Sequence, residues 1–249
     1  MKKLCCISLL MLLPLLGFAQ DAKTAAPKKE TISTYKVFPK DGHETALKAA
    51  LAAHAQKFHS GTWHWRVNEV VSGPDQGSYM IVEGPNSWTE LDDRGDLGPE
   101  HTKDYETNIT PNVDTEKSTP DMYLTYHPDV STVPASAFSV KTLIRHAYLK
   151  PGRGPRALEA LKTWKKVWEK RGMNVGVWSS FYSGEPQLAI VYRLKNGWKD
   201  LDAEMMSTRK AFEEVSGPNA YEVALEELAQ NVEKQVDEMI EFKPELSSK

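Results

Sequence analysis

The sequence has very little cysteine. Its 249 residues include two cysteines, Cys5 and Cys6, and none beyond them. The rest of the chain therefore has no material for a disulfide framework, a thiol nucleophile or a cysteine-based metal site. An excess of charge of one sign is also lacking, since 31 Lys and Arg stand against 34 Asp and Glu. This balance disfavours a wide basic surface, so we predict no nucleic-acid partner.

Signatures of several enzyme classes are missing as well. The chain has no Gly-x-Ser-x-Gly elbow, phosphate-binding loop or dinucleotide fingerprint, and no His-x-x-x-His or His-Glu-x-x-His pair for zinc. His54 and His59 are five residues apart, which would place them on different faces of one continuous helix. We therefore assign no metal ligands and interpret His54 as a histidine of the core. His64 and His146 could still meet in space, which leaves a metal or haem iron open as an alternative.

The first residues are typical of an export signal. Met1-Lys2-Lys3 is positively charged, an apolar run follows from Leu4 to Phe18, and Gly17-Phe18-Ala19 supplies small residues for cleavage. The apolar run is shorter than the roughly 20 residues that a membrane-spanning helix needs. We predict a bacterial signal peptide at residues 1–19, a periplasmic or secreted protein without a membrane span after cleavage, and a flexible leader at residues 20–32.

An internal repeat is visible at a spacing of 110 residues. The segment Asn86-Ser87-Trp88-Thr89-Glu90-Leu91-Asp92 matches Asn196-Gly197-Trp198-Lys199-Asp200-Leu201-Asp202, and the preceding Met80-Ile81-Val82 aligns with Ile190-Val191-Tyr192. Repeats of this kind indicate that one structural unit occurs twice. We predict a first unit at residues 33–131, a linker at 132–139 and a second unit at 140–247.

Each unit is expected to contain a strand, a helix, two strands, a helix and a strand, from hydrophobic periodicity and turn residues. In the first unit the predicted strands are 34–38, 63–71 and 79–83, and the predicted helices are 44–59 and 87–93. In the second unit the strands are 143–149, 175–182, 188–193 and 239–242, and the helices are 154–171, 198–215 and 219–237. Residues 95–120 are expected to form no helix.

This order of elements is the ferredoxin-like unit. Together with the Pro39-Lys40-Asp41-Gly42 and Lys150-Pro151-Gly152 turns and the duplication, it resembles the dimeric α/β-barrel superfamily, which includes antibiotic-biosynthesis-monooxygenase-like and NIPSNAP-like domains. The resemblance implies an α+β fold in which two tandem βαββαβ units pack sheet-to-sheet as an intrachain barrel. Members include cofactor-independent oxygenases, haem-binding or haem-degrading proteins and isomerases, and no catalytic signature of any one of them matches here.

Candidate functional residues come from the strand faces that the helices leave uncovered, because alternate residues of a strand point to opposite sides. Their positions predict a cavity between the sheets lined by His64, Arg66, Asn68, His146, Tyr148, Trp178 and Tyr182. We assign catalytic roles to three of them. His64 and His146 would carry protons, and Arg66 would hold an oxyanion. The other four would bind the ligand.

Three functions stay open at this point. The first is an enzyme of the cofactor-independent oxygenase or isomerase type, acting on a small apolar or aromatic molecule between the sheets. The second is a non-catalytic carrier of a small ligand, haem included. The third is a structural or interaction module with a filled barrel. A small-molecule partner is predicted, no cofactor is required apart from the haem alternative, and a homo-oligomer is left open.

Overall fold

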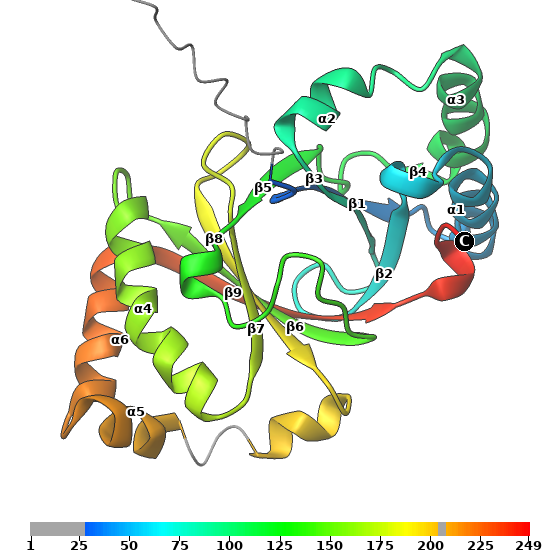
Figure 1. The fold of residues 1–249 in the computed structure, drawn as a ribbon. Helices are drawn as coiled ribbons and strands as arrows, with labels where there is room; N and C mark the ends of the chain where they lie inside the picture. The colour runs from blue at the N-terminus through cyan, green and yellow to red at the C-terminus, as the bar shows by residue number, and fades with distance from the viewer. Residues whose placement is uncertain (1–27, 204–207) are drawn as a thin grey trace, which may run out of the picture.

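The computed structural model describes residues 28–203 and 208–249. Eight of its strands form one closed antiparallel barrel (Figure 1). They are β1 (Thr31–Pro39), β2 (Trp65–Ser72), β3 (Tyr79–Asn86), β5 (Met122–Tyr126), β6 (Lys141–Leu149), β7 (Asn174–Ser179), β8 (Gln187–Leu194) and β9 (Val232–Phe242). The short β4 (Val113–Asp114) pairs with the end of β1.

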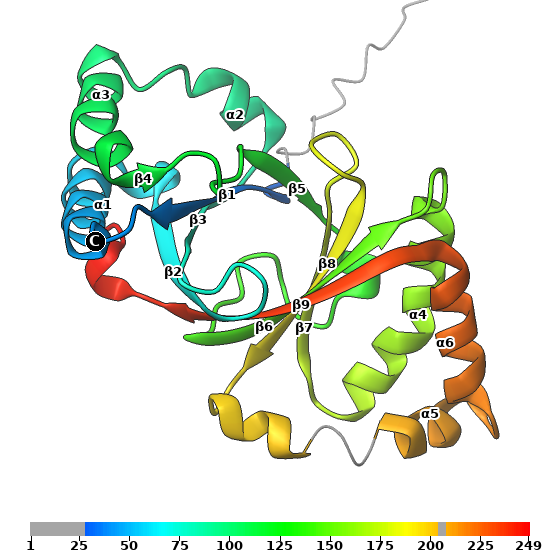
Figure 2. The same ribbon diagram turned by 180° about the vertical axis from the view of Figure 1, so that it is seen from behind.

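The barrel consists of two four-stranded sheets joined along both edges. The strand orders are β5-β1-β3-β2 in the first half and β9-β6-β8-β7 in the second, each the ferredoxin-like arrangement. Strand β2 pairs with β9, and β5 pairs with β7, so edges that would otherwise be exposed are satisfied (Figure 2). This confirms the predicted α+β fold, with both βαββαβ units in a single closed barrel.

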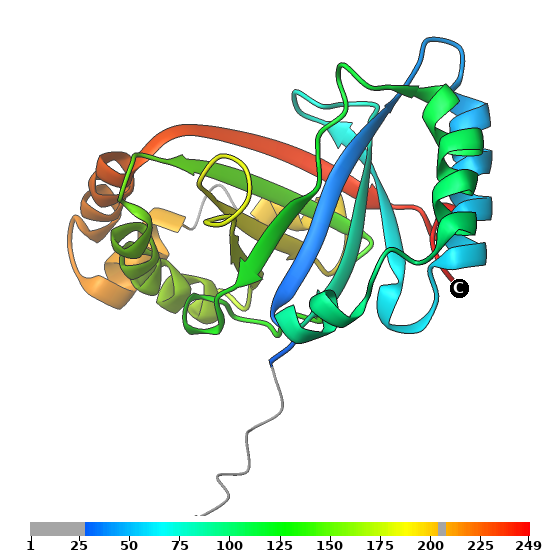
Figure 3. The same ribbon diagram turned by 90° about the horizontal axis from the view of Figure 1, so that it is seen from above.

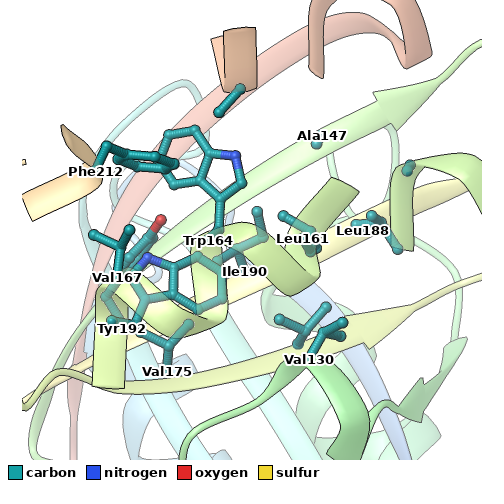
Figure 4. Packing of buried hydrophobic residues seen from close by; sticks show 14 of the residues in the cluster. Val130, Ala147, Leu161, Trp164, Val167, Val175, Leu188, Ile190, Tyr192 and Phe212 are labelled. Atoms are coloured by element: carbon teal, nitrogen blue, oxygen red, sulfur yellow. The ribbon is translucent and has the colours of Figure 1, made fainter. Parts of the chain in front are cut away.

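Helices cover the outer faces of the two sheets at opposite ends of the molecule (Figure 3). Their bounds within the described residues are α1 (Glu44–Phe58), α2 (Trp88–Asp93), α3 (Pro99–Asp104), α4 (Gly154–Lys170), α5 (Thr208–Ser216) and α6 (Ala220–Asn231). In the second half, Trp164 of α4 packs edge-on against Phe212 of α5, with ring centroids 4.7 Å apart (Figure 4). Tyr192 and Ile190 of β8 close the same cluster from the sheet.

A separate apolar cluster lies inside the barrel and draws on both halves. It contains Val70, Met80, Leu124, Tyr126, Ile144, Trp178, Ala189 and Ile240. The alternation of side chains along β2 separates this inner cluster from the outer one. Trp65 and Val67 pack outward beneath α1, while Arg66 and Asn68 point inward. Neither half therefore has a complete core of its own.

One helix prediction was wrong at its end. The helix predicted at 219–237 stops at Asn231, and the following acidic stretch is the first part of β9. Its composition favours a helix, but the chain pairs with β6 from Leu149 to Lys141, and tertiary pairing overrides local propensity. The helix predicted at 198–215 begins as a 3-10 helix, Trp198–Ala203, and resumes as α5 at Thr208, with 204–207 outside the described residues.

The stretch expected to lack a helix contains one. Gly98 has a positive φ of 88° and Pro99 occupies the first helical turn of α3, which continues through a π-helical turn to Ile109. Proline is favoured at that position because its missing N–H has no partner there anyway. Ile109 is fully buried against the apolar cluster beneath α1, and its burial stabilises this helical segment.

The repeat spacing is not constant through the sheets. Lys36 pairs with Met80 and His146 pairs with Ala189, so Met80 corresponds to Ala189 at a spacing of 109. The alignment of Met80 with Ile190 is therefore wrong by one residue, and a one-residue slip exchanges the inward and outward faces of a strand. Ile190 packs outward, whereas Met80 lies in the interior cluster.

The start of the chain is described from residue 28 onward. Strand β1 begins at Thr31, so the last two residues of the predicted leader already belong to the barrel. The predicted signal peptide lies outside the described residues. Among the described helices, none is both long enough and apolar enough to cross a membrane.

Residues 28–131 expressed alone should form dimers or aggregate. The isolated half would leave β2 and β5 as open edges and expose the inward face of its sheet to water. Size-exclusion chromatography with light scattering would measure its mass beside that of the full chain. A folded, soluble monomer of this half would contradict the shared interior core.

Candidate functional site

A cavity of about 120 Å³ lies inside the barrel, against the interior cluster. Its walls are mostly apolar side chains from both halves. The polar residues that line it are Thr34, Arg66, Asn68, Ser139, Thr142, His146 and Arg193. Within the described part of the chain, no Asp or Glu lines this space. The cavity is therefore apolar and cationic.

Arg193 on β8 is one of two partly buried arginines that line the cavity. Its Nε donates to the Ala137 carbonyl oxygen at 2.8 Å, while its Nη1 is buried with no hydrogen-bond partner among the described residues. Gly176 on the neighbouring strand makes room for it, because a Cβ at that position would lie 2.7 Å from Nη1. The absence of a side chain at Gly176 thus fixes where the guanidinium can lie.

Arg66 on β2 is the second cation. Its Nη2 donates to the Gly84 carbonyl oxygen, and neither Arg66 nor Arg193 forms an ion pair with a described carboxylate. Burial lowers the pKa of both guanidinium groups, and the charge of Arg66 lowers that of Arg193 further, to about 10. Both arginines remain cationic at neutral pH. Two like charges in one apolar space favour an anion between them.

The linker between the two halves covers this cavity. Ala135, Ala137, Phe138 and Ser139 all lie among its lining residues. The Tyr126 hydroxyl donates to the Val133 carbonyl oxygen, which ties the linker to β5. Residues 132–139 are therefore a wall of the site as well as a connection.

A buried network of charges lies beside His146 on β6. The His146 Nε2 lies 2.7 Å from Glu238 Oε1, and its Nδ1 lies 2.8 Å from Gln187 Oε1. The other Glu238 oxygen accepts from Lys36 Nζ at 2.6 Å, and Lys36 also donates to Asp75 at 2.7 Å. Lys36 and His146 occupy equivalent positions of the two first strands.

The network keeps Glu238 ionised. Burial alone would raise the pKa of this carboxyl, which is 2% exposed, but the His146 hydrogen bond and the Lys36 charge bring the pKa below its ordinary value. Burial also opposes the charge of Lys36, and Glu238 and Asp75 together raise its pKa nonetheless. Both ring nitrogens of His146 face oxygen atoms, so this histidine has no free lone pair turned to the cavity.

Four of the seven residues predicted from the sequence line the cavity, namely Arg66, Asn68, His146 and Trp178. Trp178 is 2% exposed and packs against Tyr126, with ring centroids 4.9 Å apart. These four come from three strands, one in the first half and two in the second. Their inward direction follows from alternation, as predicted.

The structure places the other three predicted residues elsewhere. His64 precedes β2, is partly buried, and has a pKa lowered by burial and by Arg66. Tyr148 follows His146 on the same face, but Lys234 Nζ covers its ring at 4.7 Å and it does not line the cavity. Tyr182 is 82% exposed, because β7 ends at Ser179 rather than at 182. Its predicted inward position is wrong.

Sequence reasoning missed Arg193 and the linker. The alignment at a spacing of 110 ended at Tyr192 and gave Arg193 no role. The spacing of 109 observed between β3 and β8 places Arg193 on the inward face of β8. Thr34 was also missed, although its Oγ1 is buried in the same cavity without a hydrogen-bond partner among the described residues. Nothing in the sequence of residues 132–139 indicates that this segment lies over the interior of the barrel.

The residues around this cavity do not fit a haem. Its volume of about 120 Å³ is well below the roughly 300–1,000 Å³ of ordinary small-molecule pockets. An axial histidine ligand needs a free ring nitrogen. His146, which lines the space, has both nitrogens engaged.

Comparison with known proteins supports the fold. No known protein family matches the sequence, and no curated protein matches it. A structure described as an anthrone oxidase-like protein shares 11% identity and a TM-score of 0.57, over 87% of this chain and 92% of that one. A candidate monooxygenase from Fusobacterium nucleatum subsp. nucleatum shares 11% identity and a TM-score of 0.53, over 85% and 91%.

At this level of identity the likeness concerns the fold alone. The likeness agrees with the α+β barrel that the sequence predicted. The NIPSNAP-like kinship and the tandem duplication stay predictions.

Replacing Glu238 by Gln should lower the free energy of unfolding by about 3 kcal/mol at pH 7, because Lys36 loses a buried counter-charge and His146 loses its carboxylate partner. The pKa of Glu238 is lowered in the folded chain, so its carboxylate stabilises the fold above its ordinary pKa of 4.5 and loses that effect as pH falls through the folded value. The difference between the two proteins should therefore shrink in acid.

Urea unfolding of both proteins from pH 7 to pH 3 measures this difference. The exposed Glu233 of the same strand provides the control, and Glu233→Gln should leave stability nearly unchanged. A gap between wild type and Glu238→Gln that stays constant down to pH 3 would show that the charge of Glu238 does not stabilise the barrel.

Proposed function

We propose that this protein binds a small organic anion with an apolar body inside its barrel. The observation that carries the proposal is the pair Arg66 and Arg193, two partly buried cations that face an apolar cavity without a carboxylate in its described lining. An uncompensated buried charge is costly, and an anionic ligand would remove that cost.

The remaining walls agree with this class of ligand. The unpartnered Arg193 Nη1 offers a donor, and the Thr34 hydroxyl offers both a donor and an acceptor. Trp178 and Ile144 present flat and aliphatic surface for the body of the ligand. A volume of about 120 Å³ favours a molecule of about one aromatic ring.

A second candidate function is catalysis on such a molecule. Two guanidinium groups would stabilise an enolate or phenolate oxygen as its charge develops, which is the demand of a cofactor-independent oxygenase or isomerase. The fold neighbours described as anthrone oxidase-like and as a candidate monooxygenase support this reading. His146 has both nitrogens engaged, so proton transfer through it would require Glu238 or Gln187 to move. His64, the other predicted proton carrier, does not line the cavity.

Export through residues 1–19 belongs to the same proposal and would place ligand binding outside the cytoplasm. The alternative of a filled structural barrel predicts no binding of small anions at all. The experiments below separate the two readings.

Benzoate should quench or shift the fluorescence of the protein on binding, because Trp178 lines the cavity. Benzyl alcohol, which has the same ring without the charge, should bind at least tenfold more weakly, since a hydrogen bond to a charged group contributes about 1.5–3 kcal/mol. Titration calorimetry would measure both affinities.

Arg193→Gln should weaken benzoate binding about tenfold or more, whereas the exposed Arg156→Gln on α4 should leave it unchanged. Equal affinities for benzoate and benzyl alcohol would refute the anion proposal. Failure of both to bind would favour the filled barrel.

Gly176→Ala should weaken benzoate binding with little loss of stability. The new Cβ would displace the Arg193 guanidinium, and the end of a flexible side chain moves at low cost. In the Arg193→Gln background the same substitution should have no further effect on affinity. Additive losses in the double variant would mean that Gly176 acts on the site by some route other than Arg193.

A further inference from the structure

Three histidines converge outside the barrel, on the side covered by α1 and α3. His54 belongs to α1, His59 follows the last residue of that helix, and His101 belongs to α3. One ring nitrogen of each lies within 4.8 Å of the others. The Nε2 atoms of His59 and His101 are 3.2 Å apart. Two ligands of a tetrahedral zinc ion with Zn–N bonds of about 2.0–2.1 Å lie roughly 3.3 Å from each other.

The outer nitrogens of the two buried rings are held by acceptors. His54 Nδ1 donates to Asp104 Oδ2 at 2.8 Å, and His59 Nδ1 donates to the Trp63 carbonyl oxygen at 3.1 Å, with Glu83 Oε2 at 3.4 Å. A hydrogen bond from one nitrogen to a carboxylate or carbonyl is the usual support of a metal-binding histidine, because it leaves the lone pair on the other.

The second ring nitrogen of His54, Nε2, makes no hydrogen bond within the described residues. The His54 side chain is fully buried. Burying a polar atom without a hydrogen-bond partner costs free energy, and a bound metal ion at this nitrogen would offset that cost.

We infer that His54, His59 and His101 bind a divalent transition-metal ion of the zinc class. Three imidazole nitrogens suit zinc, copper or nickel far better than magnesium or calcium, which prefer oxygen ligands. His101 is partly exposed, so water or an external group can complete the coordination. This site uses no residue of the barrel cavity.

A metal here would add a further tie between α1 and α3, which the His54–Asp104 hydrogen bond already joins. Helix α3 lies in the stretch between β3 and β5, and the ion would fasten it to the end of α1. Metal binding to the folded chain alone would then raise its stability by mass action. The site therefore has a readout that is independent of any enzymatic activity.

The test uses the full-length purified protein, freed of metal with a chelator and then titrated with Zn²⁺ in a calorimeter. We expect one ion per chain and a higher melting temperature. With Co²⁺ as the probe, a visible absorption band would report the coordination geometry. His101→Gln, at a partly exposed position where folding is not at risk, should abolish both signals.

Two further variants sharpen the result. Asp104→Asn removes the support of His54 and should weaken Zn²⁺ binding about 10- to 100-fold without abolishing it. His43→Gln alters an exposed histidine that contacts Asn112 and should leave binding unchanged. Equal Zn²⁺ affinities for wild type and His101→Gln, or no binding by wild type, would overturn the inference while leaving the barrel proposal untouched.

Discussion

The pairing of strands between the two halves is the constraint on which the rest of this structure depends. Strands β2 and β9, and β5 and β7, convert two open sheets into one closed ring. Closure buries both inward faces at once and leaves no main-chain edge within the ring for a foreign strand. The cavity, its two arginines and the Glu238 network all exist because inward faces from different halves meet.

The two halves share the same order of strands and helices, but their polar residues at equivalent interior positions differ. Lys36 and His146 are equivalent, yet they meet the same carboxylate, which the second half alone supplies through Glu238. Arg66 corresponds to Gly176, and this difference gives Arg193 the space that it occupies. The interior is thus asymmetric at each polar position, which is consistent with a single site built by both halves rather than two equal ones.

Sequence alone predicts the fold well because alternation and turn residues act locally. Trp65, Arg66 and Asn68 were assigned to their correct faces by period alone. The site was predicted only in part. The inward direction of Arg193 depends on the register of β8, which differs by one residue between the two hairpins. The direction of Tyr182 depends on where β7 ends.

The histidine cluster shows a different limit. The argument that His54 and His59 face apart assumed one continuous helix, but α1 ends at Phe58 and His59 has φ −111° and ψ 84°. Leaving the helix brings its ring to 5.2 Å from that of His54. His101 comes from a stretch expected to lack a helix, so its approach depends on tertiary packing that no local pattern records.

The linker across the cavity also has a kinetic consequence. The segment that joins the two halves is the one that stands over their shared interior, tied at Val133 and Ala137. The rate at which a molecule enters or leaves would be set by how often these two hydrogen bonds open together. Under the proposed function, a change in linker length would alter the rate of exchange and, through the Ala137–Arg193 hydrogen bond, the position of one cation of the site.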